Sequence, residues 1–153
     1  MSNLPHNNTL DHLATLNFIE ALARQAGAIL RQYYETPRQA NSKSTAIDLV
    51  TEADKASEKF IVGALREQFP DHHVVGEEGG GYGPAPEDTP YHWYVDPLDG
   101  TTNFAHRYPM FAVCIALSDA DLNPILGVVY NPMMDELFKG IRGHGATLNG
   151  RPL

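Results

Sequence analysis

Residues Trp93 to Phe104 read WYVDPLDGTTNF, and this stretch predicts a strand that ends among oxygen ligands. Its first three residues are aromatic or β-branched, the types that strands favour. Pro97 has no amide hydrogen for a sheet ladder, so we expect the strand to end there. The strand therefore delivers Asp96 to its carboxyl end, with Asp99 three residues further on.

The second half of the stretch is suited to binding an anion. Gly100 permits a tight turn, and Thr101, Thr102 and Asn103 supply hydroxyl, amide and backbone donors where a short helix can begin. Helix N-termini attract anions, and two nearby carboxylates can share a hard cation that bridges to a phosphate. The simpler interpretation is an ordinary turn between a strand and a helix. The complete string is far rarer than its dipeptides and favours a metal and phosphate site.

The segment Asp96 to Phe104 resembles the signature of the inositol monophosphatase family, which consists of magnesium-dependent, lithium-sensitive phosphatases. Other segments stand in the order that this family requires. They are Lys43-Ser44, Asp48 to Asp54 and Gly76-Glu77-Glu78 before the signature, and Gly127 to Tyr130 and Gly143 to Ala146 after it. The resemblance runs from about Leu13 to Leu153 and is closest to bacterial members.

The resemblance implies a set of metal ligands. Glu77, the carboxylate of Asp96 and the carbonyl of Leu98 would hold a first Mg²⁺, and Asp96 and Asp99 would share a second. Magnesium is thus the implied cofactor and lithium the implied inhibitor. Taken alone, Glu77 and its neighbour Glu78 would more often be a solvated acidic pair, and the order of the motifs favours a ligand.

The resemblance also implies catalytic and substrate-binding residues. Thr101 and Asp54 would position and deprotonate a metal-bound water, and Glu77 would act with them through the metal. The phosphate and the rest of the substrate would be contacted by Gly100, Thr101, Thr102, Asp99 and, from a mobile loop, Lys43. Without the resemblance, Asp54 would be an acid in the first turn of a helix that interacts with the helix dipole.

The chemistry of phosphoryl transfer agrees with this choice of residues. Two divalent ions about 4 Å apart can generate a nucleophile near neutral pH and stabilise both oxygens of an in-line displacement. Positioning and charge neutralisation dominate such reactions, so carboxylates and threonines suffice. The sequence contains neither a Ser-His-Asp nor a Cys-His motif. His72 and His73 are adjacent, so on a strand they point to opposite faces and chelate zinc poorly together.

The pattern of apolar residues predicts an α+β fold. A long amphipathic helix is expected from about Leu10 to Glu35, and a second from Asp54 to Phe69. Asp48 to Thr51 suggest a short strand or turn. Strands are expected at His73 to Glu78, at the signature, and at Met110 to Leu117, Leu126 to Tyr130, Glu136 to Ile141 and Ala146 to Leu148. We therefore expect two amino-terminal helices on an antiparallel sheet, which the resemblance identifies as the first half of the layered α/β sugar-phosphatase fold.

Composition excludes several classes of protein. The chain has 153 residues, 42% of them hydrophobic, which suffices for one ordinary domain. Its formal charge of -8 opposes binding to nucleic acid, and no apolar run is long enough to cross a membrane. The single cysteine, Cys114, stands among small apolar residues and is expected to be inert. Since the amino terminus lacks the features of a signal peptide, we expect a cytoplasmic protein.

Family members extend roughly a hundred residues further and contain a tryptophan-aspartate motif that this chain lacks. We therefore expect residues 10–153 to be the amino-terminal, metal-binding portion of the domain, with the carboxyl-terminal portion absent. Residues 1–9 are expected to be a disordered tail. The expected activity is hydrolysis of inositol monophosphate or a similar small polyol phosphate. The alternatives are a non-catalytic fragment that binds metal or a protein partner, or a phosphatase for histidinol phosphate, phosphoadenosine phosphate or a sugar bisphosphate. Thr102-Asn103 disfavours phosphoadenosine phosphate, because its phosphatases tend to carry Lys-Glu there. A homodimer is expected of the full-length protein, as is common in the family.

Overall fold

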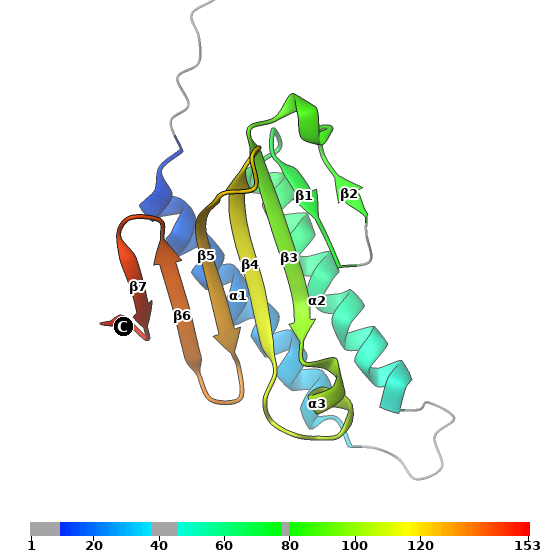
Figure 1. The fold of residues 1–153 in the computed structure, drawn as a ribbon. Coiled ribbons are helices and arrows are strands. Elements are labelled where there is room, and N and C mark those ends of the chain that lie inside the picture. The colour runs from blue at the N-terminus through cyan, green and yellow to red at the C-terminus, as the bar shows by residue number, and fades with distance from the viewer. Residues whose placement is uncertain (1–9, 38–45, 78–79) are drawn as a thin grey trace, which may run out of the picture.

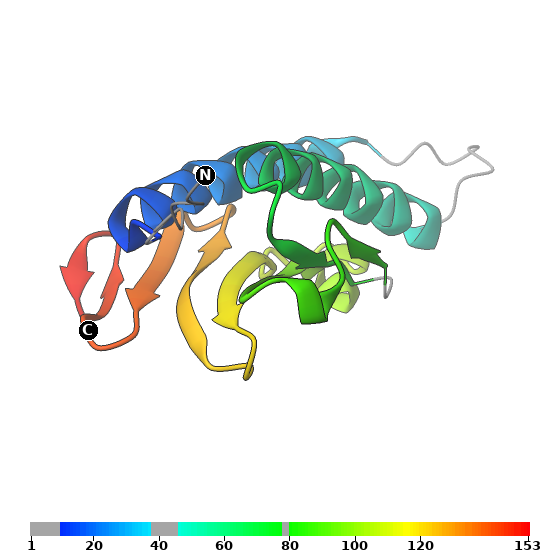
Figure 2. The ribbon, with the colours of Figure 1, turned by 90° about the horizontal axis from the view of Figure 1, so that it is seen from above.

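The computed structural model describes residues 10–37, 46–77 and 80–153, and over these residues two long helices lie against one sheet (Figure 1). Figure 2 shows both helices on the same side of that sheet. The opposite face carries no second layer within the described ranges. The expected disordered tail at 1–9, the expected loop around Lys43, and Glu78, the neighbour of Glu77, all lie outside the described residues.

The elements follow one another along the chain as two helices and then a series of short strands. The helices are α1 His12–Glu35, α2 Ala46–Gln68 and α3 Thr101–Ala105, with a 3-10 turn at Pro86–Asp88. The strands are β1 His73–Val75, β2 Gly81–Tyr82, β3 Tyr91–Asp99, β4 Ala112–Asp119, β5 Pro124–Asn131, β6 Glu136–Ile141, β7 Gly145–Leu148 and β8 Arg151–Pro152. Those predicted after the signature are confirmed to within two residues at most ends.

Helix α1 is the amphipathic helix that the periodicity predicts. The Asp11 side chain caps it by accepting a hydrogen bond from the Ala14 amide at 3.0 Å. The buried stripe consists of Leu16, Ile19, Leu22, Ala23, Ala26 and Leu30. This stripe packs across β4, β5 and β6, so the interpretation of α1 as a helix that packs on a sheet is confirmed.

Helix α2 begins earlier than predicted. Asp48 to Thr51, expected as a strand or turn, are helical, and the Thr51 hydroxyl donates to the Ile47 carbonyl one turn back at 2.9 Å. The short run of β-branched residues is ambiguous by itself. Ala53, Ser57 and Ile61 are buried at helical spacing and form the face of α2 that packs on the sheet. This packing favours a helix over a strand for the residues that precede them. Asp54 therefore lies in the interior of α2, and the alternative interpretation of Asp54 as a first-turn acid that interacts with the helix dipole is wrong.

The sheet is mixed, and its order is β2-β1-β3-β4-β5-β6-β7-β8. All neighbouring strands are antiparallel except β1 and β3, which run parallel with His73 opposite His92. The reason is connectivity: β2 and the 3-10 turn return the chain to the end of the sheet where β1 began. The α+β class is confirmed, with this one parallel pair added.

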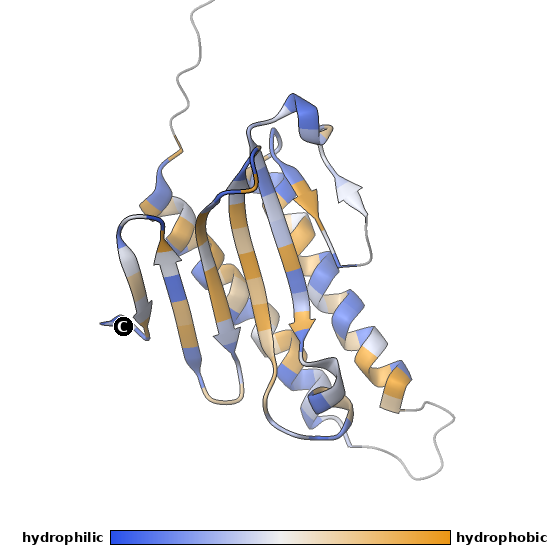
Figure 3. Cartoon of the chain, in the orientation of Figure 1, coloured by the Kyte–Doolittle hydropathy of each residue, from blue (hydrophilic) through white to orange (hydrophobic). Residues whose placement is uncertain are grey.

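The core lies between the helices and the central strands, where the apolar segments in Figure 3 face each other. Trp93, Ile115 and Leu117 are among its fully buried side chains. Trp93 Nε1 donates to His72 Nδ1 at 3.0 Å, and His73 Nδ1 lies 2.8 Å from the Pro84 carbonyl. Both histidines thus have structural roles, which agrees with the argument against zinc. None of the described helices is long and apolar enough to span a bilayer.

Candidate functional site

A β-bulge at the end of β3 shapes the centre of the site. Asp96 pairs with Cys114 and Asp99 with Ala112, so three steps along β3 correspond to two along β4. Pro97, which has no amide to donate, lies within the bulge, so β3 continues past the proline that was expected to end it. Since Cys114 and Ala112 share a face of β4, Asp96 and Asp99 are brought to that same face, away from the helices.

Helix α2 is held against this bulge by one buried hydrogen bond. The Ser57 hydroxyl donates to the Pro97 carbonyl at 2.9 Å, and Ser57 is fully buried. Asp54 lies three residues earlier on the same face of the helix. The bond therefore fixes α2 so that Asp54 approaches the carboxyl end of β3 from the helical layer.

The turn after the bulge adopts the conformation that its sequence predicts. Gly100 has φ of +90° and precedes α3, and a side chain there would bring its Cβ to 3.0 Å from the Met110 carbonyl. Thr101 is half-buried at the first position of α3, while Thr102 is exposed. The side-chain amide of Asn103 donates through Nδ2 to the same Met110 carbonyl at 2.8 Å and stabilises the turn.

Glu77, which follows β1, is in direct contact with Asp96 near the carboxyl end of the neighbouring strand β3. Burial of its carboxyl, the charges of Asp54, Asp96 and Glu58, and a hydrogen bond with Asp96 raise the pKa of Glu77 to about 7. The pKa of Asp96 is also raised, by burial first and by the charge of Asp99. The Leu98 amide and the proton of Glu77 oppose that rise by donating to Asp96. Near pH 7 the carboxyl of Glu77 is therefore partly protonated and can donate to Asp96.

Glu58 is a further member of this acidic group. Its carboxylate accepts hydrogen bonds from the Glu77 amide at 3.2 Å and from the Tyr82 hydroxyl at 3.4 Å. A Cβ at Gly76 would lie 2.7 Å from the Glu58 carboxylate. Glycine at that position therefore allows Glu58 to reach the backbone of Glu77 and fix the direction in which Glu77 leaves β1.

The acidic residues fit a divalent cation in two respects. Asp96 Oδ1 is buried and accepts no hydrogen bond from the residues that the structure describes, which is costly for a carboxylate oxygen without another partner. The contact between Glu77 and Asp96 places two carboxyl groups close enough for a cation to bridge them. Within 10–37, 46–77 and 80–153, no three acidic, histidine or cysteine side chains converge as a preformed metal site. Asp99 faces the same side as Asp96 without completing such a group.

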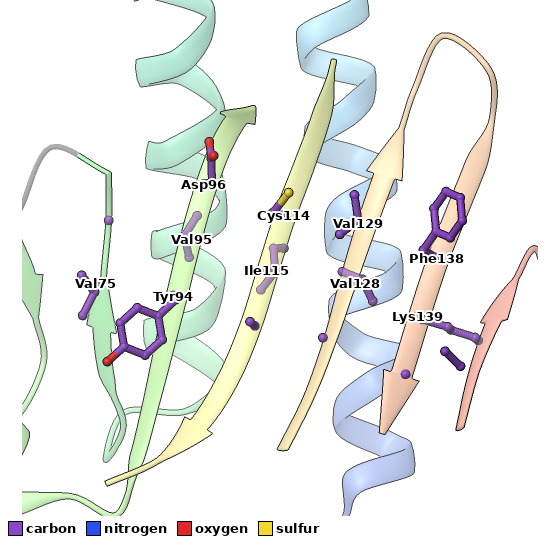
Figure 4. Close-up of a pocket in the computed structure, with 15 residues that line it drawn as sticks. Val75, Tyr94, Val95, Asp96, Cys114, Ile115, Val128, Val129, Phe138 and Lys139 are labelled. Carbon is purple, nitrogen blue, oxygen red and sulfur yellow. The ribbon is translucent and has the colours of Figure 1, made fainter. Parts of the chain in front are cut away.

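The uncovered face of the sheet beside Asp96 is an apolar hollow of about 500 Å³. Figure 4 shows Asp96 and Cys114 side by side on neighbouring strands, with Tyr94, Val129 and Phe138 along the same face. Burial, together with the charges of Asp96 and Asp99, raises the pKa of Cys114 to about 12. The thiol therefore stays protonated, in agreement with its expected inertness.

The structure places Asp54 and Asp96 near enough to Glu77, and Asp99 near enough to Asp96, for their charges to interact. The Leu98 side chain is buried in the core. Gly100, Thr101 and Thr102 follow directly on the same turn, while Lys43 lies outside the described residues. Sequence reasoning missed Ser57 and Glu58. Their spacing of three and four residues from Asp54 was the available signal, because such residues share a helix face.

Comparisons with known proteins show the family of the chain and its fold. Residues 11–153 match the sequence profile described as the inositol monophosphatase family. Inositol monophosphatase 3 of Solanum lycopersicum is 47% identical over 135 residues, which are 86% of this chain and 48% of the relative. Inositol-1-monophosphatase of Synechocystis is 46% identical over 128 residues, which are 84% and 44% of the two chains.

A solved inositol monophosphatase from Anabaena superposes on this fold with a TM-score of 0.78 and 41% identity. The superposition covers 94% of this chain and 50% of that one. The chain spans about half the length of the curated relatives that it matches.

Proposed function

Because the chain belongs to the inositol monophosphatase family, we propose that it carries the metal-binding part of a Mg²⁺-dependent phosphatase for small phosphorylated polyols. The family is one of phosphatases and is generally metal-dependent. The observation that best supports the proposal is the contact between the carboxyl groups of Glu77 and Asp96, beside a buried Asp96 oxygen that accepts no hydrogen bond from the described residues.

Magnesium is the metal that suits this set of ligands. Glu77, Asp96, Asp99 and the Leu98 carbonyl offer only oxygen, and hard cations such as Mg²⁺ prefer oxygen ligands. Bound there, Mg²⁺ would neutralise phosphate charge and lower the pKa of a coordinated water. By the same family membership, we expect lithium to inhibit the reaction.

The remaining residues would orient the reactants. We assign to the Thr101 hydroxyl and the Asp54 carboxylate the task of holding the attacking water and accepting its proton. They come from different elements, α3 and α2, and the bond from Ser57 to Pro97 fixes α2 against the bulge that leads to α3. The distance between the Thr101 hydroxyl and the Asp54 carboxylate would then be set by packed elements and not by a flexible loop.

The substrate would meet the turn after the bulge. Gly100, Thr101 and Thr102 supply amides and hydroxyls for the phosphate oxygens, and Asp99 is exposed and free to contact a substrate hydroxyl. Lys43 would add a positive charge. Two of the relatives are named for inositol monophosphate, which makes it our first choice; histidinol phosphate, phosphoadenosine phosphate and sugar bisphosphates rank lower. We further propose a cytoplasmic location and, for the full-length protein, a homodimer.

The test is an assay of phosphate release from inositol monophosphate, with and without Mg²⁺. It compares the 153-residue chain with Asp96→Asn and with Asp121→Asn, an exposed aspartate in the turn between β4 and β5. We expect Mg²⁺-stimulated release that Asp96→Asn abolishes and Asp121→Asn preserves. Mg²⁺ binding without release would favour the second candidate, a metal-binding chain without turnover. Absence of both would refute the proposal.

A further inference from the structure

A second cavity of about 540 Å³ lies on the outer side of α2, against β2. We call it the α2 groove. It is lined by Asp54, Lys55, Glu58, Lys59, Val62, Gly63, Arg66 and Tyr82. Figure 1 places α2 at the edge of the helical layer, beside β1 and β2. Through Asp54 and Glu58 the groove shares a wall with the acidic group around Glu77.

Three positive charges in the α2 groove have no ion-pair partner within the described part of the chain. Among the described basic residues, Arg24, Arg31, Lys139 and Arg142 each lie within 4 Å of a carboxylate. Lys55, Lys59 and Arg66 do not, and all three are exposed. In a chain of formal charge -8, a gathering of unpaired cations in one groove creates a local positive potential that attracts anions.

The two carboxylates in the lining do not cancel these charges. Glu58 is turned toward β1 and β2, where it accepts hydrogen bonds from the Glu77 amide and the Tyr82 hydroxyl. Asp54 lies at the end of the groove nearest Glu77. At a spacing of four residues, Asp54 and Glu58 form an acidic row on the side of the metal ligands, and Lys55 and Lys59 form a parallel basic row that Arg66 continues.

The spacing along α2 suits an anion with more than one charged group. Lys55 and Lys59 are one helical turn apart, so both can reach a single phosphate. Arg66 lies seven residues further, a rise of about 10 Å from Lys59. Its guanidinium can hold a second phosphate in a bidentate fashion.

Gly63 is a second feature that points to a ligand. It lies in the interior of α2 between Lys59 and Arg66, where glycine is unfavourable compared with alanine. A Cβ there would meet no atom within 4 Å, so packing within the described chain does not require the glycine. Its effect is to leave bare backbone at the middle of the groove, where a ligand can approach closely.

We propose that the α2 groove binds a small molecule that carries at least two phosphate groups, separately from the substrate phosphate that the turn from Gly100 to Thr102 would bind. Lys55 and Lys59 hold one phosphate and Arg66 holds the other. The site stands whether or not the metal site is catalytic, because none of its cations is a proposed metal ligand.

The experiment is calorimetric titration with inorganic tripolyphosphate in the presence of EDTA, so that failure of the metal site does not alter the result. Orthophosphate and a hexaglutamate peptide are titrated in parallel. The variants are Lys59→Gln/Arg66→Gln and, as a matched control, Arg151→Gln, which removes an exposed and unpaired cation outside the groove. Gly63→Ala tests the close approach.

We expect tripolyphosphate to bind at least tenfold more tightly than orthophosphate or hexaglutamate. The double variant should lose at least tenfold in affinity, and Arg151→Gln less than twofold. Gly63→Ala should weaken binding while raising the melting temperature, a combination that a purely structural glycine does not give. Absence of binding, equal losses in Arg151→Gln, an unaffected Gly63→Ala, or equally tight hexaglutamate binding would each overturn the proposal; the last would indicate an acidic protein partner.

Discussion

Asp96 and Asp99 face the same side of the sheet although they are three residues apart, a spacing that puts side chains on opposite faces of a regular strand. The bulge at Pro97 and Leu98 adds one residue to β3 and so corrects the alternation. The charge of Asp99 is then close enough to raise the pKa of Asp96. Repulsion between these two carboxylates destabilises the fold of the metal-free chain. The same pair of charges can attract a cation.

Asp96→Asn should stabilise the metal-free chain and remove its response to Mg²⁺. The asparagine keeps the shape of the side chain but removes a buried charge that Asp99 repels. In EDTA at pH 8 we expect a higher melting temperature than for the wild type. Addition of Mg²⁺ should raise the melting temperature of the wild type only, because affinity falls at least about tenfold in the variant, or about 1.4 kcal/mol. A variant less stable than the wild type in EDTA would contradict this.

Ser57→Ala should weaken the site without touching a metal ligand. The Pro97 carbonyl loses its donor from α2, and we expect a loss of about 1–2 kcal/mol in the free energy of unfolding, measured in urea. Mg²⁺ affinity should fall about tenfold, because supporting groups of this kind orient ligands. The control is Ser118→Ala, a buried serine whose hydroxyl donates to Asp119, remote from the site. A similar loss of Mg²⁺ affinity in the control would show a general effect of destabilisation.

Mg²⁺ affinity should rise with pH through neutrality. Glu77 has its pKa raised to about 7 from the ordinary 4.5, so below pH 7 a proton competes with the metal. For the metal-free chain the sign is opposite. A raised acid pKa stabilises the fold below pH 4.5, and that contribution is lost as pH rises to about 7. Glu77→Gln should flatten the pH dependence of stability in EDTA over this interval, measured by urea unfolding; an unchanged profile would exclude Glu77 as its source.

A second pH effect should come from His72, which is stacked on Phe69 with ring centroids 4.9 Å apart. Burial lowers its pKa from 6.5 to about 4, so the neutral ring accepts the hydrogen bond from Trp93. A lowered base pKa gives stability that is present above pH 6.5 and lost as pH falls toward 4, by up to about 3 kcal/mol. His72→Gln keeps an acceptor for Trp93 and should remove this dependence. His144→Gln, which alters an exposed histidine, should keep it.

The uncovered sheet face should bind apolar dyes and cause the 153-residue chain to self-associate. Tyr94, Val129 and Phe138 are 37%, 40% and 37% exposed on this face (Figure 4). Val129→Thr/Phe138→Thr should lower dye fluorescence and shift the size-exclusion peak toward the monomer. Leu122→Asn removes an exposed apolar residue from a turn and should change neither. A monodisperse wild-type monomer without dye binding would refute the prediction.

Most elements were predictable because their signals are local. The stripe from Leu16 to Leu30 on α1 and the strand residues of β3 to β7 follow from periodicities of 3.6 and 2 within single segments. The turn at Gly100 is likewise encoded where it occurs. The prediction failed at Asp48 to Thr51, because four residues are too few to distinguish a strand from the end of a helix by sequence alone. Packing on the sheet determines that they are helical.

The sequence by itself determined the family, the acidic and hydroxyl residues of the candidate site and their order along the chain, since these depend on residue type and spacing alone. Only the tertiary structure decided that Asp96 and Asp99 share a face, that Ser57 and Glu58 from α2 support the site, and that Lys55, Lys59 and Arg66 line one groove against β2. These features depend on strand register, on a bulge and on helix docking. Each is a contact between segments far apart in the chain, whose free energy no single segment carries.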